Sequence, residues 1–251
     1  MNEEKNLNIS ICMTTYNGEL FLSEQLRSIL SQIHDGDELI VSDDNSTDST
    51  LEILTEFNNE YGNMHIFSNK ENIGVIKNFE KALLHCKNDV IVLSDQDDVW
   101  FDTKLDRFRG KFVENSSLMV ISNAIIVNED LNIEFGLIFS EKKKEKFSLM
   151  SQVFHNKFIG CCIAFNKELL ELALPFPGNI SMHDWWLGTC ALYIGDVSYI
   201  KEPLLYYRRH SSNTSPMKRR DMKIVIKSKI YDIFNICIMM KRRLDLLLRN
   251  Y

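Results

Sequence analysis

Residues 90–100 read Val-Ile-Val-Leu-Ser-Asp-Gln-Asp-Asp-Val-Trp, an apolar run that ends in three carboxylates. Four consecutive apolar residues are typical of a strand buried on both faces, as in a parallel sheet. Two carboxylates about 4 Å apart repel by roughly 4 kcal/mol at an effective dielectric constant near 20. The repulsion is tolerable if the groups spread into water, if one stays protonated, or if a cation lies among them. Such oxygen ligands suit Mg²⁺ or Mn²⁺ carrying substrate phosphates. The alternative is an acidic turn that caps the next helix.

Three further strands are expected before this run, at residues 8–13, 38–42 and 64–67, with helices between them. This alternation predicts βαβ units and an α/β fold with a mostly parallel, Rossmann-like sheet flanked by helices. Ligands of such sheets bind outside the carboxyl ends of the strands. Three polar clusters follow the expected strands and should therefore converge on one edge of the sheet: residues 15–17, 43–44 and 95–98. Neither G-x-G-x-x-G nor G-x-x-x-x-G-K-[ST] occurs, so the two commonest phosphate-binding loops are absent.

The 251 residues are 45% hydrophobic and 25% charged, which fits one large domain at 1–216 followed by a basic, amphipathic helical tail at 217–251. The tail holds ten Lys/Arg and three Asp, which gives it a charge of +7. Because the net charge of the whole chain is −6, residues 1–216 carry a charge of −13. An acidic body argues against nucleic-acid binding, and a basic tail favours contact with an anionic surface. The tail either lies on an anionic membrane leaflet or packs on the domain or on another subunit.

The six cysteines show no C-x-x-C pair, and several lie in apolar runs, so we expect reduced core residues. Residues 1–8 lack the apolar segment of a signal peptide, and no apolar run approaches the length of a membrane span. These features predict a cytoplasmic protein, peripheral at the inner face of the plasma membrane if the tail binds lipid.

Four runs resemble the inverting family 2 glycosyltransferases with the GT-A fold: 9–18 (ISICMTTYNG), 41–48 (VSDDNSTD), 72–74 (NIG) and 94–98 (SDQDD). The Ser-Asp-Gln-Asp-Asp-x-Trp form, with HDWW at 183–186 and YRRH at 207–210, is most similar to the bacterial rhamnosyltransferase-like branch. The resemblance covers roughly residues 8–215 in the expected order and leaves the tail outside.

This resemblance implies transfer of a sugar from a UDP- or dTDP-sugar to an acceptor hydroxyl, with inversion, in bacterial cell-surface polysaccharide synthesis. The cofactor would be Mn²⁺ or Mg²⁺, and the acceptor a saccharide, free or lipid-linked. The resemblance also implies roles for single residues. Those expected at the nucleotide are Thr15, Tyr16, Asn17, Asp43 (accepting from the pyrimidine N3–H), Asn72 and Asp95 (facing the ribose). Those expected at the metal are Asp97 and His210.

On the acceptor side, the resemblance implies that Asp184 is the general base. The residues expected around the sugar are Gly160, His183, Trp185 and Trp186. A free Asp has a pKa near 3.9, and burial against the tryptophans would raise the pKa of Asp184 in the useful direction.

Each role has a structural alternative. Asp43 could simply support the next helix, and we expect that role for Asp44; Asp98 could cap the helix from Asp102, so we rank it below Asp97. Asp184 could be an N-cap. Instead of His210, the neighbouring Arg208 and Arg209 could bind the diphosphate.

Two other functions remain open from the sequence. A nucleotidyltransferase would carry a glycine-rich, arginine-containing loop after its first strand, and residues 14–18 are not one. A non-catalytic sugar- or nucleotide-binding module on a transferase fold would have no need to keep Asp43, Asp97 and Asp184 together.

Overall fold

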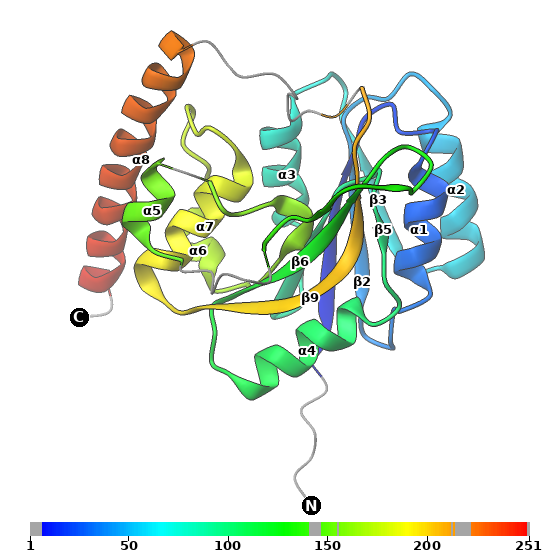
Figure 1. The fold of residues 1–251 in the computed structure, drawn as a ribbon, viewed down its shortest axis with the longest axis horizontal. Coiled ribbons are helices and arrows are strands. Elements are labelled where there is room, and N and C mark those ends of the chain that lie inside the picture. Colours follow the sequence, from blue (N-terminus) through cyan, green and yellow to red (C-terminus); the bar gives the residue numbers. More distant parts are fainter. Residues whose placement is uncertain (1–6, 141–146, 155, 212, 214–221, 250–251) are drawn as a thin grey trace, which may run out of the picture.

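The computed structural model describes residues 7–140, 147–154, 156–211, 213 and 222–249. In this part of the chain the strands form one nine-stranded sheet (Figure 1). Its first half contains strands β1 (Ile9–Thr15), β2 (Glu38–Asp43), β3 (Met64–Ser68) and β4 (Val90–Ser94) in the order β3-β2-β1-β4. Neighbouring strands in this half are parallel, which confirms the predicted α/β class.

Strands β1, β2 and β4 are buried at every position, which explains why the sequence of β4 is apolar without alternation. Met13 lies beside both Val41 and Ser94, and Thr15 lies beside Asp43. The three strands therefore end at the same edge of the sheet, with the polar residues that follow each of them.

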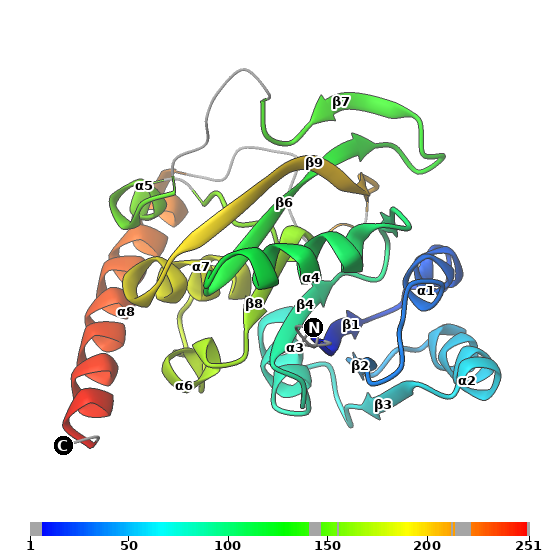
Figure 2. The same cartoon turned by 90° about the horizontal axis from the view of Figure 1, so that it is seen from below.

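Three helices connect these strands: α1 (Leu22–Leu30), α2 (Thr50–Tyr61) and α3 (Val75–Leu83). Helix α1 buries the predicted apolar stripe through Leu22, Leu26 and Ile29. Helices α1 and α2 lie on one side of the strands and α3 on the other, as both views show (Figures 1 and 2). The parallel half is thus a layered α/β unit.

The second half of the sheet is mixed. Its strands are β5 (Val99–Trp100), β6 (Met119–Val127), β7 (Ile133–Leu137), β8 (Ile163–Asn166) and β9 (Val197–Arg208). Strand β8 joins the halves by pairing antiparallel with β4 and β6, while β9 runs parallel to β6. The helical elements here are α4 (Lys104–Glu114), α5 (Leu149–Phe154), a 3₁₀ turn (Gly160–Cys162), α6 (Leu169–Ala173) and α7 (His183–Ile194).

A final helix, α8 (Met222–Arg249), packs against α5 and α6 at one end of the molecule (Figure 1). The helical tail is therefore confirmed over this range, whereas its expected start at 217 falls outside the described residues. No helix in the described ranges combines the length and the apolarity that a membrane crossing requires. Five cysteines are buried, as expected, but Cys237 on α8 is exposed.

Candidate functional site

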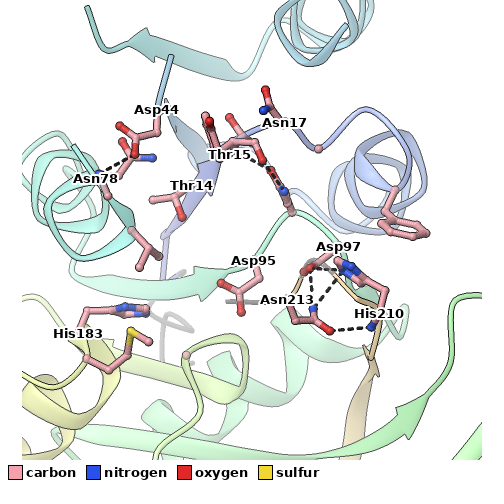
Figure 3. A pocket seen from close by; sticks show the side chains of 18 of the residues that line it. Thr14, Thr15, Asn17, Asp44, Asn78, Asp95, Asp97, His183, His210 and Asn213 are labelled. Atoms are coloured by element: carbon pink, nitrogen blue, oxygen red, sulfur yellow. Dashed lines mark hydrogen bonds and ion pairs between the residues drawn. The ribbon is translucent and has the colours of Figure 1, made fainter. Parts of the chain in front are cut away.

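A pocket of about 570 Å³ opens at the carboxyl ends of β1, β2 and β4. Its wall combines residues that follow these strands with residues from the start of α7 and from the end of β9 (Figure 3). The parallel half therefore supplies one side of the pocket and the mixed half the other. Binding at this edge of the sheet is the arrangement that open α/β folds favour.

Thr15 at the end of β1 and Tyr16 and Asn17 in the loop after it, which were expected at a nucleotide, line the pocket. Gln96, from the acidic run, fixes this loop at two points. Its Oε1 accepts a hydrogen bond from the Tyr16 main-chain N–H (2.8 Å), and its Nε2 donates to the Tyr16 carbonyl (3.0 Å). A Cβ at Gly18 would lie 2.4 Å from the same Oε1, so a larger residue here would displace the Gln96 amide. The loop and the acidic run are thus held as one unit.

Asp43 does not lie on the pocket wall, contrary to the prediction that it reads a base there. Its side chain is fully buried. Its Oδ1 accepts hydrogen bonds from the hydroxyls of Thr15 (2.8 Å) and Ser46 (2.5 Å), and its Oδ2 accepts one from the Ser46 N–H (2.9 Å). Asp43 therefore holds together the loops that follow β1 and β2.

Asp44, expected to be only a capping residue, lies on the wall instead. Consecutive side chains of an extended chain point to opposite sides, so of these two neighbouring carboxylates Asp44 faces the pocket and Asp43 faces away from it. The Oδ1 of Asp44 accepts from the Ile73 N–H and from Asn69 Nδ2, and its Oδ2 accepts from the Gly74 N–H, each at 2.8 Å. These bonds position the loop that carries Asn72, which was expected at a nucleotide and lines the pocket.

The two residues predicted at the metal, Asp97 and His210, lie together on the pocket wall (Figure 3). The Nε2 of His210 is 2.7 Å from Oδ2 of Asp97, and Asn213 Nδ2 donates to the same oxygen at 3.1 Å. Asp95 lines the pocket close by. Burial, followed by the charges of Asp97 and Asp184, raises the pKa of Asp95 to about 7.

This donor set fits a divalent cation. Carboxylate oxygens suit Mg²⁺ and Mn²⁺, and imidazole is a common ligand of the transition metals. After burial, the charge of Asp97 is the largest cause of the raised pKa of Asp95, so a cation beside them would also relieve the repulsion between the two carboxylates. The residues that could hold it are Asp97 and His210, with Asp95 beside them.

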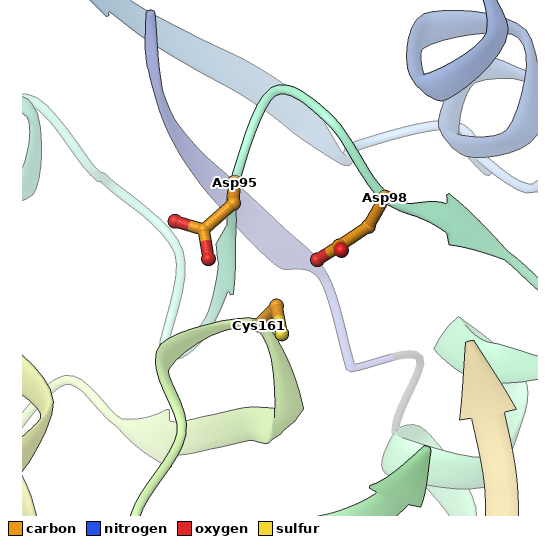
Figure 4. Close-up of side chains that lie close together, drawn as sticks. All are labelled: Asp95, Asp98 and Cys161. Atoms are coloured by element: carbon orange, nitrogen blue, oxygen red, sulfur yellow. The ribbon is translucent and has the colours of Figure 1, made fainter. Parts of the chain in front are cut away.

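A second cluster, Asp95, Asp98 and Cys161, brings possible ligand atoms within 4.8 Å of one another (Figure 4). Asp98 is fully buried and does not line the pocket. Its Oδ1 accepts from the Arg208 N–H at 3.1 Å, while its Oδ2 has no hydrogen-bond partner among the described residues. Burial raises the pKa of the Asp98 carboxyl and of the Cys161 thiol well above their ordinary values.

The buried Lys104 supplies a positive charge to this cluster. Its ammonium donates to the Cys161 carbonyl at 2.7 Å and lies 3.9 Å from the centre of the Trp100 ring. Burial lowers the pKa of Lys104 to about 8, although Asp98 and Asp95 oppose that shift. A lysine already balances the carboxylates, and a protonated thiol is a poor metal ligand. The Asp97–His210 side of the pocket therefore fits a cation better than this cluster does.

Asp184 enters the pocket from the first turn of α7. Its Oδ1 accepts hydrogen bonds from Asn156 Nδ2 (3.2 Å) and from the Trp185 N–H (2.5 Å). Burial raises the pKa of Asp184 to about 7, against these hydrogen bonds, which lower it. A carboxyl group with such a pKa can take up a proton near neutral pH.

His183 lines the pocket beside Asp184 and is only 5% exposed. Its ring stacks on Phe79 with 3.9 Å between centroids, and both ring nitrogens lack a partner among the described residues. Burial lowers the pKa of His183 to about 3, so the ring is neutral at pH 7. Gly160 faces this ring across the wall, where a Cβ would lie 3.0 Å from its Nε2.

Trp185 and Trp186 do not reach the pocket, contrary to the prediction that they hold a sugar. They are 1% and 0% exposed, and their indole N–H groups donate to the carbonyls of Gln152 (3.2 Å) and Ala173 (2.9 Å). Each helical residue is rotated by about 100° from the one before, so they turn from the pocket into the core. The pair anchors α7 instead of contacting a ligand.

Arg208, the predicted alternative for diphosphate binding, also lies outside the pocket. Its guanidinium is buried and pairs with the carboxylate of Glu24 and the carbonyls of Asp97 and Glu129. Other residues of the pocket wall carried no separate signal in the sequence. Among them are the polar residues Thr14, Asn78, Gln96, Tyr207 and Asn213.

Comparison with curated proteins finds bacterial glycosyltransferases. The chain is 31% identical over 214 residues to the dTDP-rhamnosyl transferase RfbG of Shigella flexneri, covering 80% of this chain and 72% of that protein. It is 25% identical over 224 residues to the UDP-Glc:alpha-D-GlcNAc-diphosphoundecaprenol beta-1,3-glucosyltransferase WfgD of Escherichia coli, covering 86% and 82%.

Among solved structures, TarS 1–349 of S. aureus in complex with UDP-GlcNAc superposes with a TM-score of 0.72 at 20% identity, over 91% of this chain. This chain spans 67% of that structure and 60% of another of the same protein. The sequence model "Glycosyl transferase family 2" matches residues 10–172, which contain the loops of the parallel half and the acidic run. The chain therefore belongs to glycosyl transferase family 2.

Proposed function

We propose that this protein transfers a sugar from a UDP- or dTDP-sugar to a hydroxyl of a saccharide acceptor, with inversion. The observation that carries the proposal is the composition of one pocket. Its wall holds a nucleotide-side loop, a carboxylate–imidazole pair suited to a cation, and the carboxyl of Asp184 with a pKa of about 7. The names of RfbG and WfgD, which specify dTDP-rhamnose and UDP-glucose, support a pyrimidine nucleotide donor.

The nucleotide would lie against Thr15, Tyr16, Asn17 and Asn72. We assign the contact with the pyrimidine N3–H to Asp44 in place of Asp43, because Asp44 lies on the wall. Its Oδ2 accepts one hydrogen bond, and a carboxylate oxygen has room for a second. Asp43 then supports the loop from below, and Asp95 faces the ribose.

Asp97 and His210 would hold Mn²⁺ or Mg²⁺, with Asn213 orienting the carboxylate. When bound, the cation neutralises the charge of the diphosphate leaving group. A solved mannosyltransferase of Pyrobaculum calidifontis, 20% identical with a TM-score of 0.58, is described in complex with GDP-Man and Mn²⁺.

Asp184 would accept the proton of the attacking hydroxyl. A base works best when its pKa lies near the working pH, and burial gives Asp184 that value. His183 is neutral, and its ring nitrogens have no hydrogen-bond partner in the part of the chain that the structure describes. The ring therefore offers one N–H donor and one nitrogen acceptor to the hydroxyls of a sugar. Gly160 leaves the space in which this ring lies.

We place the reaction in cell-surface polysaccharide synthesis on the cytoplasmic side of the membrane, with an acceptor that is free or lipid-linked. The name of WfgD specifies a diphosphoundecaprenol-linked acceptor.

The test is a screen of UDP- and dTDP-sugars with Mn²⁺, followed by release of the nucleoside diphosphate and by the NMR signal of the product's anomeric proton. We expect the wild type to turn over a donor and give a product with inverted anomeric configuration, and we expect Asp184→Asn to lose this turnover. The proposal would be contradicted if UDP and dTDP with Mn²⁺ left the melting temperature unchanged and no diphosphate were released from any donor.

A further inference from the structure

Helix α8 presents a row of apolar side chains to solvent. Over residues 227–249, whose side chains the structure describes, its exposed apolar residues are Ile230, Ile233, Phe234, Cys237, Met240, Leu244, Leu247 and Leu248. We call this row the outer face of α8. Six of the eight follow steps of three and four residues, so they lie along one side of the helix for about five turns. Each side chain with a stated exposure is between 44% and 66% exposed.

The opposite side of α8 is fixed to the domain. Asp232, Asn235 and Met239 are buried, and Asn235 Nδ2 donates to the Asn179 carbonyl at 3.2 Å. The guanidinium of Arg242 donates to the last two carbonyls of α6 and to the carbonyl of Pro175 just beyond that helix, the latter at 2.7 Å. Because these contacts set the rotation of the helix, its outer face is held away from the core.

Positive charges border the outer face. Lys227, Lys241 and Arg249 are exposed. The two carboxylates between residues 227 and 249 differ: Asp232 is buried and pairs with Lys229 at 3.1 Å, and Asp245 is exposed. The solvent side of the helix is therefore apolar along its length and cationic at its borders.

We propose that the outer face of α8 docks on an anionic lipid bilayer, with the helix lying in the plane of the headgroups. An apolar face with bordering cations is the composition of interfacial helices, because the side chains enter the acyl boundary while the cations contact anionic headgroups. A second copy of the chain fits less well. A two-fold interface places the same surface on both sides, so the cations of one copy would meet those of the other with one exposed carboxylate each.

This docking is independent of the sugar that the pocket transfers. It places the catalytic domain at a membrane surface even if the donor or acceptor differs from those proposed.

Cys237 provides a direct readout, because the other five cysteines are buried. A polarity-sensitive fluorophore on Cys237 of the full chain should shift to shorter wavelength with vesicles of phosphatidylcholine and phosphatidylglycerol, and not with phosphatidylcholine alone. In vesicle flotation, the unlabelled triple variant Ile233→Glu/Phe234→Glu/Leu244→Glu should lose about tenfold or more in partitioning. The matched control is Leu84→Glu/Val113→Glu, at exposed apolar positions outside α8 (68% and 69%), which should partition like the wild type.

Three results would overturn the proposal. The first is a wild-type protein that does not float with anionic vesicles, and the second is a triple variant, with an unchanged melting temperature, that floats as well as the wild type. The third is a wild-type protein that is a dimer in light scattering and does not bind vesicles, together with a triple variant that is a monomer. That result would assign the outer face to a second copy. Nucleotide-dependent thermal shifts should be equal in all variants, so loss of docking is distinguishable from failure of the proposed function.

Discussion

The Nε2 of His210 lies 2.7 Å from Oδ2 of Asp97, although 113 positions separate the two residues. The main chain of β9 makes this contact possible. Arg208 at its end donates its N–H to Asp98, and the Arg209 N–H bonds to the carbonyl of Val127 on β6. The imidazole is therefore positioned by a strand of the mixed half against a carboxylate that follows β4 of the parallel half.

If Asp97 holds the cation, Asp97→Ala should abolish the stabilisation that UDP or dTDP gains from Mn²⁺ and leave the fold intact. The reason is that it removes one of the two ligands proposed for the cation. The measurement is the melting temperature with nucleotide, with and without metal. Asp102→Ala, an exposed carboxylate five residues on, is the control and should respond like the wild type. A full metal response in Asp97→Ala would exclude this residue as a ligand.

Asp184→Asn keeps the size of the side chain but cannot take a proton, so turnover should fall by about 10²–10⁴ while metal-dependent donor binding stays near normal. In the wild type, kcat/KM should fall as the pH drops through about 7, because protonation of Asp184 removes the base. Asp95 also has a pKa of about 7, so kcat/KM should be measured against pH in Asp95→Asn as well. The fall in kcat/KM below about pH 7 should persist in that variant. Turnover of Asp184→Asn at the wild-type rate would make His183 the next candidate.

The same pKa has a consequence for stability. The folded-state pKa of Asp184, about 7, lies above its ordinary value of 3.8, so ionising this carboxylate costs stability as the pH rises through that range. Asp184→Asn should therefore be more stable than the wild type at pH 8, by up to roughly 4 kcal/mol, and lose that advantage at pH 4. Urea unfolding at the two pH values measures the difference. An equal effect at both would show that the charge of Asp184 is not buried.

The two adjacent carboxylates should separate binding from stability. Asp44→Ala removes an acceptor on the wall and the support of the 72–74 loop, so affinity for UDP or dTDP should fall roughly tenfold or more. Asp43→Ala removes three hydrogen bonds away from the pocket, so its main effect should be a lower free energy of unfolding. Calorimetry and urea titration measure the two effects. Weaker nucleotide binding in Asp43→Ala at unchanged stability would return the base contact to Asp43.

Gly160→Ala should act through His183. The new Cβ would lie 3.0 Å from Nε2 of His183, so the ring must move. We expect a higher KM for the sugar donor or acceptor with an unchanged Kd for free UDP, and the same split in His183→Phe, which can still stack on Phe79. Gly178→Ala is the matched control, since nothing lies within 4 Å of its Cβ. If Gly160→Ala weakens the binding of UDP itself, His183 acts on the nucleotide and not on the sugar.

Patterns that report burial predicted the fold well. The apolar run of β4 and the stripe of α1 have periods that depend on which faces are buried, and the structure confirms both. Side-chain direction at the end of an element was less accessible. Asp43 and Asp44 are adjacent and chemically equal, and only the direction of the chain after β2 decides which faces the pocket.

The tryptophans illustrate the same difficulty on a helix. Trp185 and Trp186 follow Asp184 directly, yet the helical rotation takes them into the core. Asn213 and Tyr207 reach the pocket because β9 passes beside it, and no local pattern encodes that path. The sequence therefore identified the segments that meet at the site, and tertiary packing decided which residue of each segment faces it.

The hydrogen bonds and the ion pair of the Arg208 side chain have a consequence for synthesis on the ribosome. Its side chain bonds to residues 184, 111 and 79 positions earlier, and β4 is covered only when β8 pairs with it. A nascent chain that ends after β4 can form the parallel strands, but it exposes an apolar sheet edge and has half a pocket. Contacts this distant in sequence form slowly. Chaperones that shield sheet edges should therefore bind the emerging chain until its last third has been made.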